Sequence, residues 1–320
     1  RSLMIFGQGA ILCHPHARNV VKAVEAEDVP SFRSAMLGWM GHLAMTSIRV
    51  VVRGLTRGWS KPAAAGGVTG KYYRRLSWAS ARYALMTDLA MFLIGGELKS
   101  KSKLTGRYAD ALSWMYLATC TLRRFEAEGR RPEDEVLMRW SVEYALARVQ
   151  EAFDGMYANF EAPVIGLWLR TIGRLSLKIN PLGSEPSDRL GAEVARVTQT
   201  LDERYHRLTP MVASADENTA GAGRLIKAMR LLQDAEPHLV KVRKAIKARQ
   251  LPRSAPESLA QAALEAGIID KAGANAIEIA QSARLEAIEV DVFTPDEYFR
   301  NVAPAGIEQS GIETKQAVNA

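Results

Sequence analysis

Cysteine is scarce in this chain of 320 residues, which contains only Cys13 and Cys120. The two form no CxxC pair and cannot build a disulfide framework, so a disulfide-rich secreted fold is excluded and a reducing cytoplasm is favoured. Long hydrophobic runs are missing too. The longest candidate, Leu76 to Gly96, is interrupted by Arg82 and Asp88, so we expect no membrane-spanning helix.

Strand signals are nearly absent, because Ile48–Val52 is the one strand-like run and is too isolated to build a sheet. Apolar residues instead recur every three or four positions, as in helices with one buried face. With 48% hydrophobic and 24% charged residues, the composition is globular, and we expect an all-α antiparallel helix bundle. The three clearest stripes are Leu76, Ala79, Tyr83, Met86, Ala90 and Leu93; Tyr108, Ala111, Met115, Ala118, Leu122 and Phe125; and Val142, Leu146, Val149, Phe153, Met156 and Phe160.

Helix-breaking residues separate these stripes and suggest the organisation of the chain. Asp270 is placed to cap a helix that runs to about Ile288. Capping boxes are expected at 254–257 and 294–297. Breaks are expected at Gly95-Gly96, Gly129, Pro132, 180–187 and 250–256. We expect four parts, at residues 1–28, 29–250, 251–300 and a disordered tail at 301–320.

Positive charge is concentrated in the first part of the chain. Residues 1–131 hold 20 Lys and Arg against 8 Asp and Glu, whereas the remainder holds 22 against 27. The densest basic stretch, 49–107, could face phosphates, anionic lipid or an acidic neighbouring domain. An ordinary solvated face is an equally good interpretation.

Motifs that carry chemistry are mostly incomplete. Residues 65–72 resemble a phosphate-binding loop, but Ala65 replaces its first glycine and Tyr72 its hydroxyl residue, which predicts a flexible connector. Gly7-Gln8-Gly9 lacks the third glycine of a dinucleotide site. Cys13, His14 and His16 predict a helix terminus with exposed imidazoles, and we expect no metal site. His42, His206 and His238 are scattered singly.

Residues 163–181 predict an amphipathic basic helix. Ile165, Trp168, Ile172, Leu175 and Ile179 form an apolar stripe, while Arg170, Arg174 and Lys178 follow at four-residue spacing on another face. Such a helix can lie in a lipid interface. Docking of the apolar stripe on the protein core is the favoured interpretation, because most amphipathic helices do so.

Several strings in order resemble bacterial long-chain acyl-coenzyme A dehydrogenases of the FadE type. The opening Arg1–Ile11 followed by Cys-His-Pro resembles the end of their flavin domain. The other strings are Gly95–Lys99, Arg107–Ala118, Arg123–Gly129, Pro186–Leu190 and Gly267–Lys271. The resemblance covers most of residues 1–290. It implies that residues 1–28 end the family's helical domain and that residues 29–250 form its additional C-terminal helical domain.

The resemblance implies a defined reaction for the parent protein, the first step of fatty acid β-oxidation. A glutamate removes the α-proton of a medium- or long-chain acyl-CoA while the β-hydrogen leaves as hydride to FAD, which gives trans-2-enoyl-CoA. Electron-transfer flavoprotein is the implied electron acceptor. A homo-oligomer is expected, cytoplasmic or peripheral at the inner membrane through residues 163–181.

No catalytic residue is carried over onto this sequence. The family's catalytic Glu-Gly pair lies a few residues before the position of Arg1, so the chain is expected to be the C-terminal part of a longer, active polypeptide. Glu25, Glu27 and Glu97 match no base motif. We expect this piece to serve as a scaffold, assembly or membrane-docking domain and to be inactive alone.

Two other classes of protein remain open from the residues. The first is a free-standing basic helical protein that binds nucleic acid, for which Tyr72 and Tyr73 beside Arg74 and Arg75 are the one local hint. No recognised nucleic-acid motif accompanies them, and no nucleic-acid partner is expected. The second is a membrane-surface adaptor built on residues 163–181.

Overall fold

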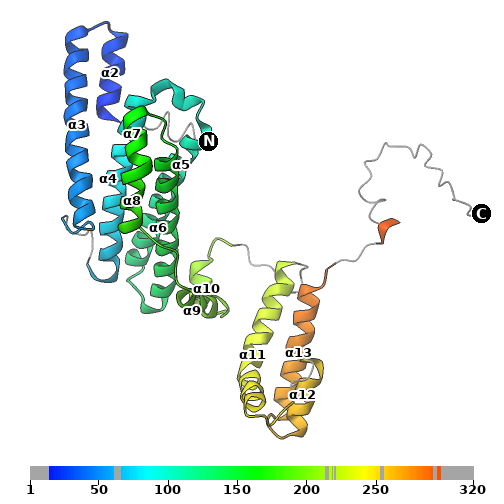
Figure 1. Cartoon of the computed structure of the whole chain (residues 1–320). Helices are drawn as coiled ribbons and strands as arrows, with labels where there is room; N and C mark the ends of the chain where they lie inside the picture. Colours follow the sequence, from blue (N-terminus) through cyan, green and yellow to red (C-terminus); the bar gives the residue numbers. More distant parts are fainter. Residues whose placement is uncertain are drawn as a thin grey trace, which may run out of the picture. The chain divides into compact units, whose positions relative to one another are not determined.

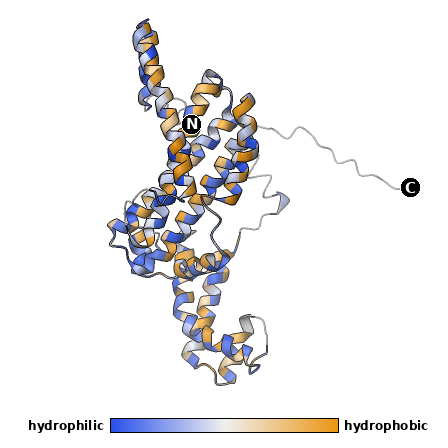
Figure 2. Ribbon diagram, turned by 60° about the vertical axis from the view of Figure 1, so that its left-hand side comes forward, coloured by the Kyte–Doolittle hydropathy of each residue, from blue (hydrophilic) through white to orange (hydrophobic). Residues whose placement is uncertain are grey.

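The computed structural model describes residues 14–60, 66–212, 216–217, 219, 221–252, 256–290 and 294–296. The chain divides into a first compact unit, Arg1–Thr198, and a second, Gln199–Ala320 (Figure 1). The described residues contain helices and no strand, which confirms the predicted all-α fold. Hydrophobic and hydrophilic residues alternate along the helices of both units (Figure 2).

The first unit is a bundle of consecutive antiparallel helices. Its core lies mainly between α5 and α6, where all twelve predicted stripe residues are buried, as the helical spacing required. The predicted stripe of α4 is buried except for Tyr83 and Leu93. The elements are α2 (Pro15–Glu25), α3 (Val29–Leu55), η2 (Gly67–Thr69), α4 (Gly70–Leu93), η3 (Gly95–Lys99), α5 (Ser102–Ala127), η4 (Pro132–Asp134), α6 (Glu135–Ala158), α7 (Pro163–Trp168), the π-helical η5 (Leu169–Gly173), α8 (Arg174–Ile179) and α9 (Asp188–Thr198).

The second unit has a smaller core built largely from alanine. Asp270 caps α13 as predicted, accepting a hydrogen bond of 2.8 Å from the Gly273 backbone, and α13 ends at Ile288. Gly273 is required there, because a Cβ would lie 2.3 Å from His238 Nδ1. The elements are α10 (Glu203–Leu208), α11 (Ala222–Lys247), α12 (Pro256–Glu265) and α13 (Lys271–Ile288).

Several local expectations need correction. The strand-like run Ile48–Val52 is helical and lies within α3, because flanking helix-forming residues extend one continuous helix through it. Residues 70–72, expected in a flexible connector, begin α4, and Tyr72 is fully buried. The division into compact units falls at Thr198, inside the expected part 29–250, while α2 packs on α3 and α11 on α13; the expected parts stay a prediction.

Some of the other expectations on helix ends are confirmed, and the rest concern residues that the structure does not describe. The breaks at Gly95-Gly96, Gly129, Pro132 and 180–187 fall between helices or at helix starts, and so do the described residues of 250–256. The capping boxes at 254–257 and 294–297 and the tail at 301–320 fall wholly or partly outside the described residues.

The burial of the α6 stripe predicts the effect of core truncation. Phe153→Ala should lower the free energy of unfolding of the first unit by about 3–5 kcal/mol, because the removed ring leaves a cavity. Leu93→Ala, at a side chain that is 45% exposed, should cost less than about 1 kcal/mol. Urea unfolding followed by tryptophan fluorescence measures both, and equal losses would contradict this assignment of helix faces.

Candidate functional site

The hairpin of α2 and α3 begins each of its helices with a side-chain cap. His14 Nδ1 accepts from the Ala17 N–H at 3.0 Å, ahead of a proline at the first helical position. Asp28 caps α3, accepting from the Ser31 N–H at 3.0 Å and the Ser31 hydroxyl at 2.6 Å. These hydrogen bonds lower the pKa of Asp28. The two caps fix where the helices start and therefore which residues face each other.

Three helices contribute to a cluster around one buried carboxylate, which we call the Asp88 cluster: His14, Trp39, His42 and Asp88. Asp88, in α4, is 1% exposed. Trp39 Nε1, from α3, donates to Asp88 Oδ1 at 3.1 Å. His14 Nε2 lies 2.8 Å from the same oxygen, and His42 Nε2 lies 3.6 Å from Oδ2. The cluster therefore joins α2, α3 and α4.

The cap at His14 defines the protonation of this ring. Because Nδ1 accepts from a backbone N–H, the proton of the neutral ring is on Nε2, beside Asp88. That N–H is not well aligned with Oδ1, so the contact is electrostatic more than a full hydrogen bond. Burial, the largest influence, lowers the pKa of His14, and it outweighs the opposing effect of Asp88. His14 is therefore neutral, and its side chain is 12% exposed. The expected exposed imidazole is wrong for this residue.

His14, His42 and Asp88 also have the ligand types of a metal site, with one ligand atom from each lying within 4.8 Å of the others. A metal at His14 Nε2 requires the proton on Nδ1, where the Ala17 N–H already points. The helix cap and a metal ion therefore require opposite tautomers of the His14 ring. The Asp88 cluster is better suited to holding helices together, and the expectation of no metal site stays a prediction.

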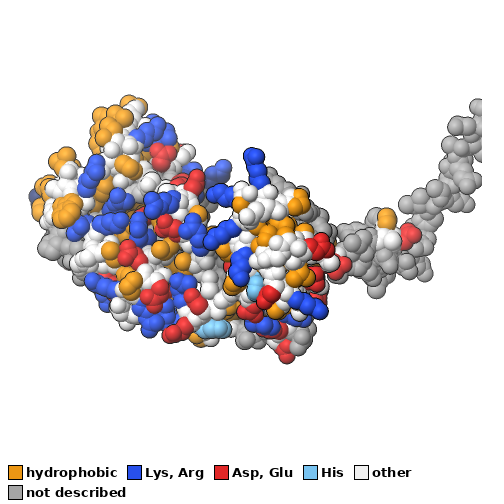
Figure 3. Space-filling model, turned by 90° about the horizontal axis from the view of Figure 1, so that it is seen from below, with side chains coloured by type: hydrophobic (Ala, Val, Ile, Leu, Met, Phe, Trp, Pro, Cys, Tyr) orange, Lys and Arg blue, Asp and Glu red, His pale blue; other side chains and the backbone are white. Residues whose placement is uncertain are grey.

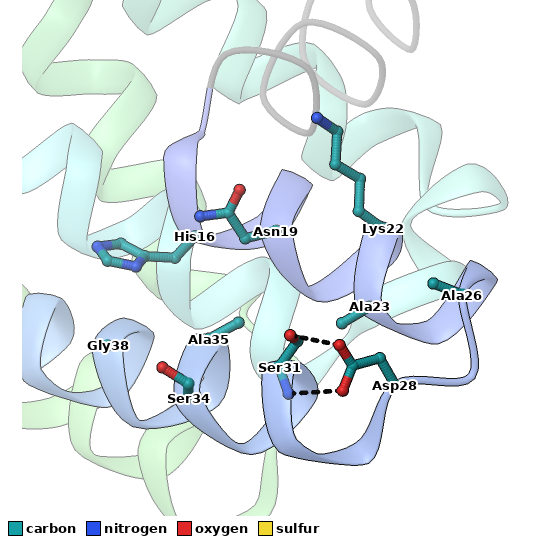
Figure 4. A pocket seen from close by; sticks show the side chains of 10 residues that line it. All are labelled: His16, Asn19, Lys22, Ala23, Ala26, Asp28, Ser31, Ser34, Ala35 and Gly38. Atoms are coloured by element: carbon teal, nitrogen blue, oxygen red, sulfur yellow. Dashed lines mark hydrogen bonds between the residues drawn. The ribbon is translucent and has the colours of Figure 1, made fainter.

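A polar groove of about 590 Å³ lies between α2 and α3 (Figure 4). Ala23, Ala35 and Gly38 line part of it. Its charged residues are not directed at a common point, because Asp28 is occupied by Ser31 and Lys22 extends away from the groove. The groove therefore shows no converging set of polar groups that would define a ligand.

The outward side of α3 carries a row of exposed apolar side chains from Leu37 to Leu55. Trp39 and Thr46 are buried on the inner side. The exposed side chains opposite them include Leu37, Ile48 and Leu55, which are 62%, 56% and 83% exposed. Among the described residues, α3 is the helix that is long and apolar enough to cross a membrane by length and composition, with 11% of its most apolar window buried. The expectation of no membrane-spanning helix rested on residues 76–96 and did not include α3.

Residues 163–179 present the predicted apolar stripe to the outside. Trp168, Ile172, Leu175 and Ile179 are exposed, whereas Ile165 is half-buried and packs against the core, so the favoured interpretation that this stripe docks on the core is wrong for four of its five residues. Four smaller or less conspicuous residues face inward instead: Gly166, Leu169, Gly173 and Leu177. Of the basic residues, Arg174 is bound to Asp154 at 2.8 and 3.0 Å, while Arg170 and Lys178 are exposed.

The remaining sequence candidates do not assemble into a site. His206 contacts the Tyr205 ring and His238 lies beside Gly273, both in the second unit. Glu25, Glu27 and Glu97 are exposed. Cys13 and Gly7-Gln8-Gly9 lie outside the described residues.

The fold defines the class of the chain as an all-α helical bundle domain. Residues 11–293 match the family model described as "acyl-CoA dehydrogenase, C-terminal, bacterial type". The chain belongs to this family, as the sequence resemblance predicted. No solved structure matches it.

The lowered pKa of His14 predicts a pH-dependent stability. As the pH falls below 6.5, the ordinary pKa of histidine, the unfolded chain takes up a proton at His14 that the folded chain resists. The free energy of unfolding should therefore decrease as the pH is lowered through this range. His14→Asn keeps a capping oxygen but removes the titrating ring, and it should reduce the slope of unfolding free energy against pH. His206→Asn, at an exposed position in α10, is the control and should keep that slope.

Proposed function

We propose that the chain is the C-terminal region of a FAD-dependent acyl-CoA dehydrogenase of the FadE type, which converts medium- or long-chain acyl-CoA to trans-2-enoyl-CoA in fatty acid β-oxidation. The observation that carries this proposal is the family match over residues 11–293. The all-α fold of the described residues supports it, since it suits the added helical domain that the resemblance implies.

Within this parent enzyme, we assign the chain a scaffold role and no catalytic base. A base that acts on an acyl thioester needs a carboxylate with a raised pKa that faces the substrate. The buried carboxylates among the described residues are Asp88 and Asp134. Asp88 faces Trp39 and two imidazoles, and Asp134 ends a 3₁₀ turn ahead of α6. Neither faces the groove between α2 and α3.

The groove between α2 and α3 also fits FAD poorly. A flavin site needs polar groups that converge on the ring and phosphates, whereas Asp28 is committed to its cap and Lys22 extends away. We therefore assign no flavin step to these residues, and FAD belongs to the rest of the parent. The proposed partners are the catalytic body itself, acyl-CoA, electron-transfer flavoprotein and further copies in a homo-oligomer. The proposed location is the cytoplasm, with peripheral membrane contact through residues 163–181.

The alternative function in nucleic-acid binding loses its one local support. Tyr72 is buried and donates to Glu143 at 2.7 Å, while Tyr73 donates to Glu126 at 2.9 Å. Both phenols are therefore committed within the bundle, and the Tyr72 ring cannot stack on a base.

The scaffold role predicts an inactive, colourless chain. The purified 320-residue protein should show no flavin absorbance and should not reduce an electron acceptor with palmitoyl-CoA. The same assay on the chain joined to the catalytic part that this proposal places ahead of it should show both. A yellow isolated chain, or turnover by it, would place flavin and base within these residues and overturn the scaffold role.

A further inference from the structure

Most exposed large hydrophobic side chains of the described first unit lie on two segments. One is the α3 outer face, formed by Leu37, Met40, Met45, Ile48, Val51, Val52 and Leu55. The other is the α7–α8 outer face, formed by Val164, Leu167, Trp168, Ile172, Leu175 and Ile179. Single exposed apolar residues are ordinary, but contiguous apolar faces of this length mark interaction surfaces.

Specific contacts on the inner side of each segment fix its orientation, so that its apolar outer face points to solvent. The inner side of α3 is fixed by Trp39 in the Asp88 cluster and by Arg53, which donates to the Ser77 carbonyl at 2.7 Å. The inner side of α7–α8 is fixed by close approach. A Cβ at Gly166 would lie 2.3 Å from the Phe160 carbonyl oxygen, and one at Gly173 would lie 3.1 Å from the Tyr157 ring.

The two segments meet at their C-terminal ends. Asn180, directly after α8, donates from Nδ2 to the Gly54 carbonyl in the last turn of α3, at 2.8 Å. Trp59 lies just beyond this point, 70% exposed, with the Arg74 guanidinium 3.7 Å from its ring centre. Seen from below, hydrophobic side chains gather at the left and upper edge of the first unit beside several Lys and Arg (Figure 3).

The charge on these segments has one sign. α3 contains three arginines and no Asp or Glu. The segment 163–179 contains Arg170, Arg174 and Lys178 and likewise no acidic residue. A protein partner or a second copy would not require this exclusion of acidic groups, whereas an anionic lipid surface repels them and attracts cations at the rim of an apolar face.

We propose that the α3 outer face and the α7–α8 outer face together form a docking surface for an anionic lipid bilayer. Apolar side chains would enter the boundary between headgroups and acyl chains, to a depth of about 5–10 Å. Trp59 and Trp168 suit the headgroup level, and Arg33, Arg49, Arg170 and Lys178 are exposed to meet lipid phosphates.

The proposal places α3 along the membrane and not across it. Its inner side contacts α2 and α4 and includes His42, Arg53 and the Asp88 contact of Trp39. Insertion across the bilayer would strip these polar groups of their partners, which is costly in hydrocarbon. This surface rests on the membrane contact proposed above for residues 163–181 and extends it to α3, and vesicle binding tests it separately from the reaction proposed for the parent.

Vesicle flotation of the whole chain tests the surface, with phosphatidylcholine vesicles that contain or lack phosphatidylglycerol. We expect the chain to float with the anionic vesicles and to be released by salt. The variant Leu37→Glu, Ile48→Glu, Leu55→Glu should reduce the bound fraction about tenfold or more, and so should Trp168→Glu with Ile172→Glu. All five positions are exposed, so the fold should persist, which circular dichroism checks.

A matched control replaces exposed hydrophobic residues elsewhere in the first unit. The variant Leu112→Glu, Tyr116→Glu, Leu117→Glu changes three exposed positions of α5 and should keep binding within about twofold. A chain that fails to float with anionic vesicles overturns the proposal. So does equal flotation of all variants, or a change from dimer to monomer in the α3 variant with unaltered flotation, which would identify a protein interface.

Discussion

The attachment of α3 depends on one buried carboxylate. Asp88 lies in the middle of α4 with 1% exposure, where an unpartnered charge would cost several kcal/mol. Its surroundings are the indole of Trp39 and the imidazoles of His14 and His42, so the α2–α3 hairpin supplies every contact described for it. A hydrogen bond to a charged group contributes about 1.5–3 kcal/mol. Rotating α3 about its axis would lose the hydrogen bond from Trp39 and move His42 away from Asp88, which fixes the side of α3 that faces the bundle.

The helices of the main core were predictable because their sequences are asymmetric. In α5 and α6 one long stripe of apolar residues is continuous from end to end, and that stripe is buried, whereas Leu112, Tyr116 and Leu117 on another side of α5 are exposed. Helix ends were predictable for a similarly local reason. Gly129 and Pro132 act through their own backbone geometry, and the Asp270 side chain accepts from a backbone N–H three residues further on. Both kinds of signal lie within a few residues of the feature that they specify.

The exposed helices were not predictable because they are apolar on more than one side. Periodicity shows which residues share a face, but it cannot show which of two apolar faces has a neighbour. In residues 163–179 the larger side chains were predicted to face the core. The face with Gly166 and Gly173 is buried instead, because small residues allow the backbones to approach closely. The seven-residue spacing of these glycines was the signal available in the sequence.

The Asp88 cluster was out of reach of the sequence for a different reason. His14, Trp39 and His42 precede Asp88 by long stretches of chain, and no local pattern links a histidine at a helix start to a carboxylate in another helix. The cluster and the two inner glycines nevertheless have a common consequence. The Asp88 cluster holds the inner side of α3 against the bundle, and the two glycines hold the inner side of residues 163–179. The outer sides cannot make these contacts, so each segment keeps its apolar outer face exposed. The absence of acidic residues on both segments favours, as the partner of these faces, a surface that attracts positive charge.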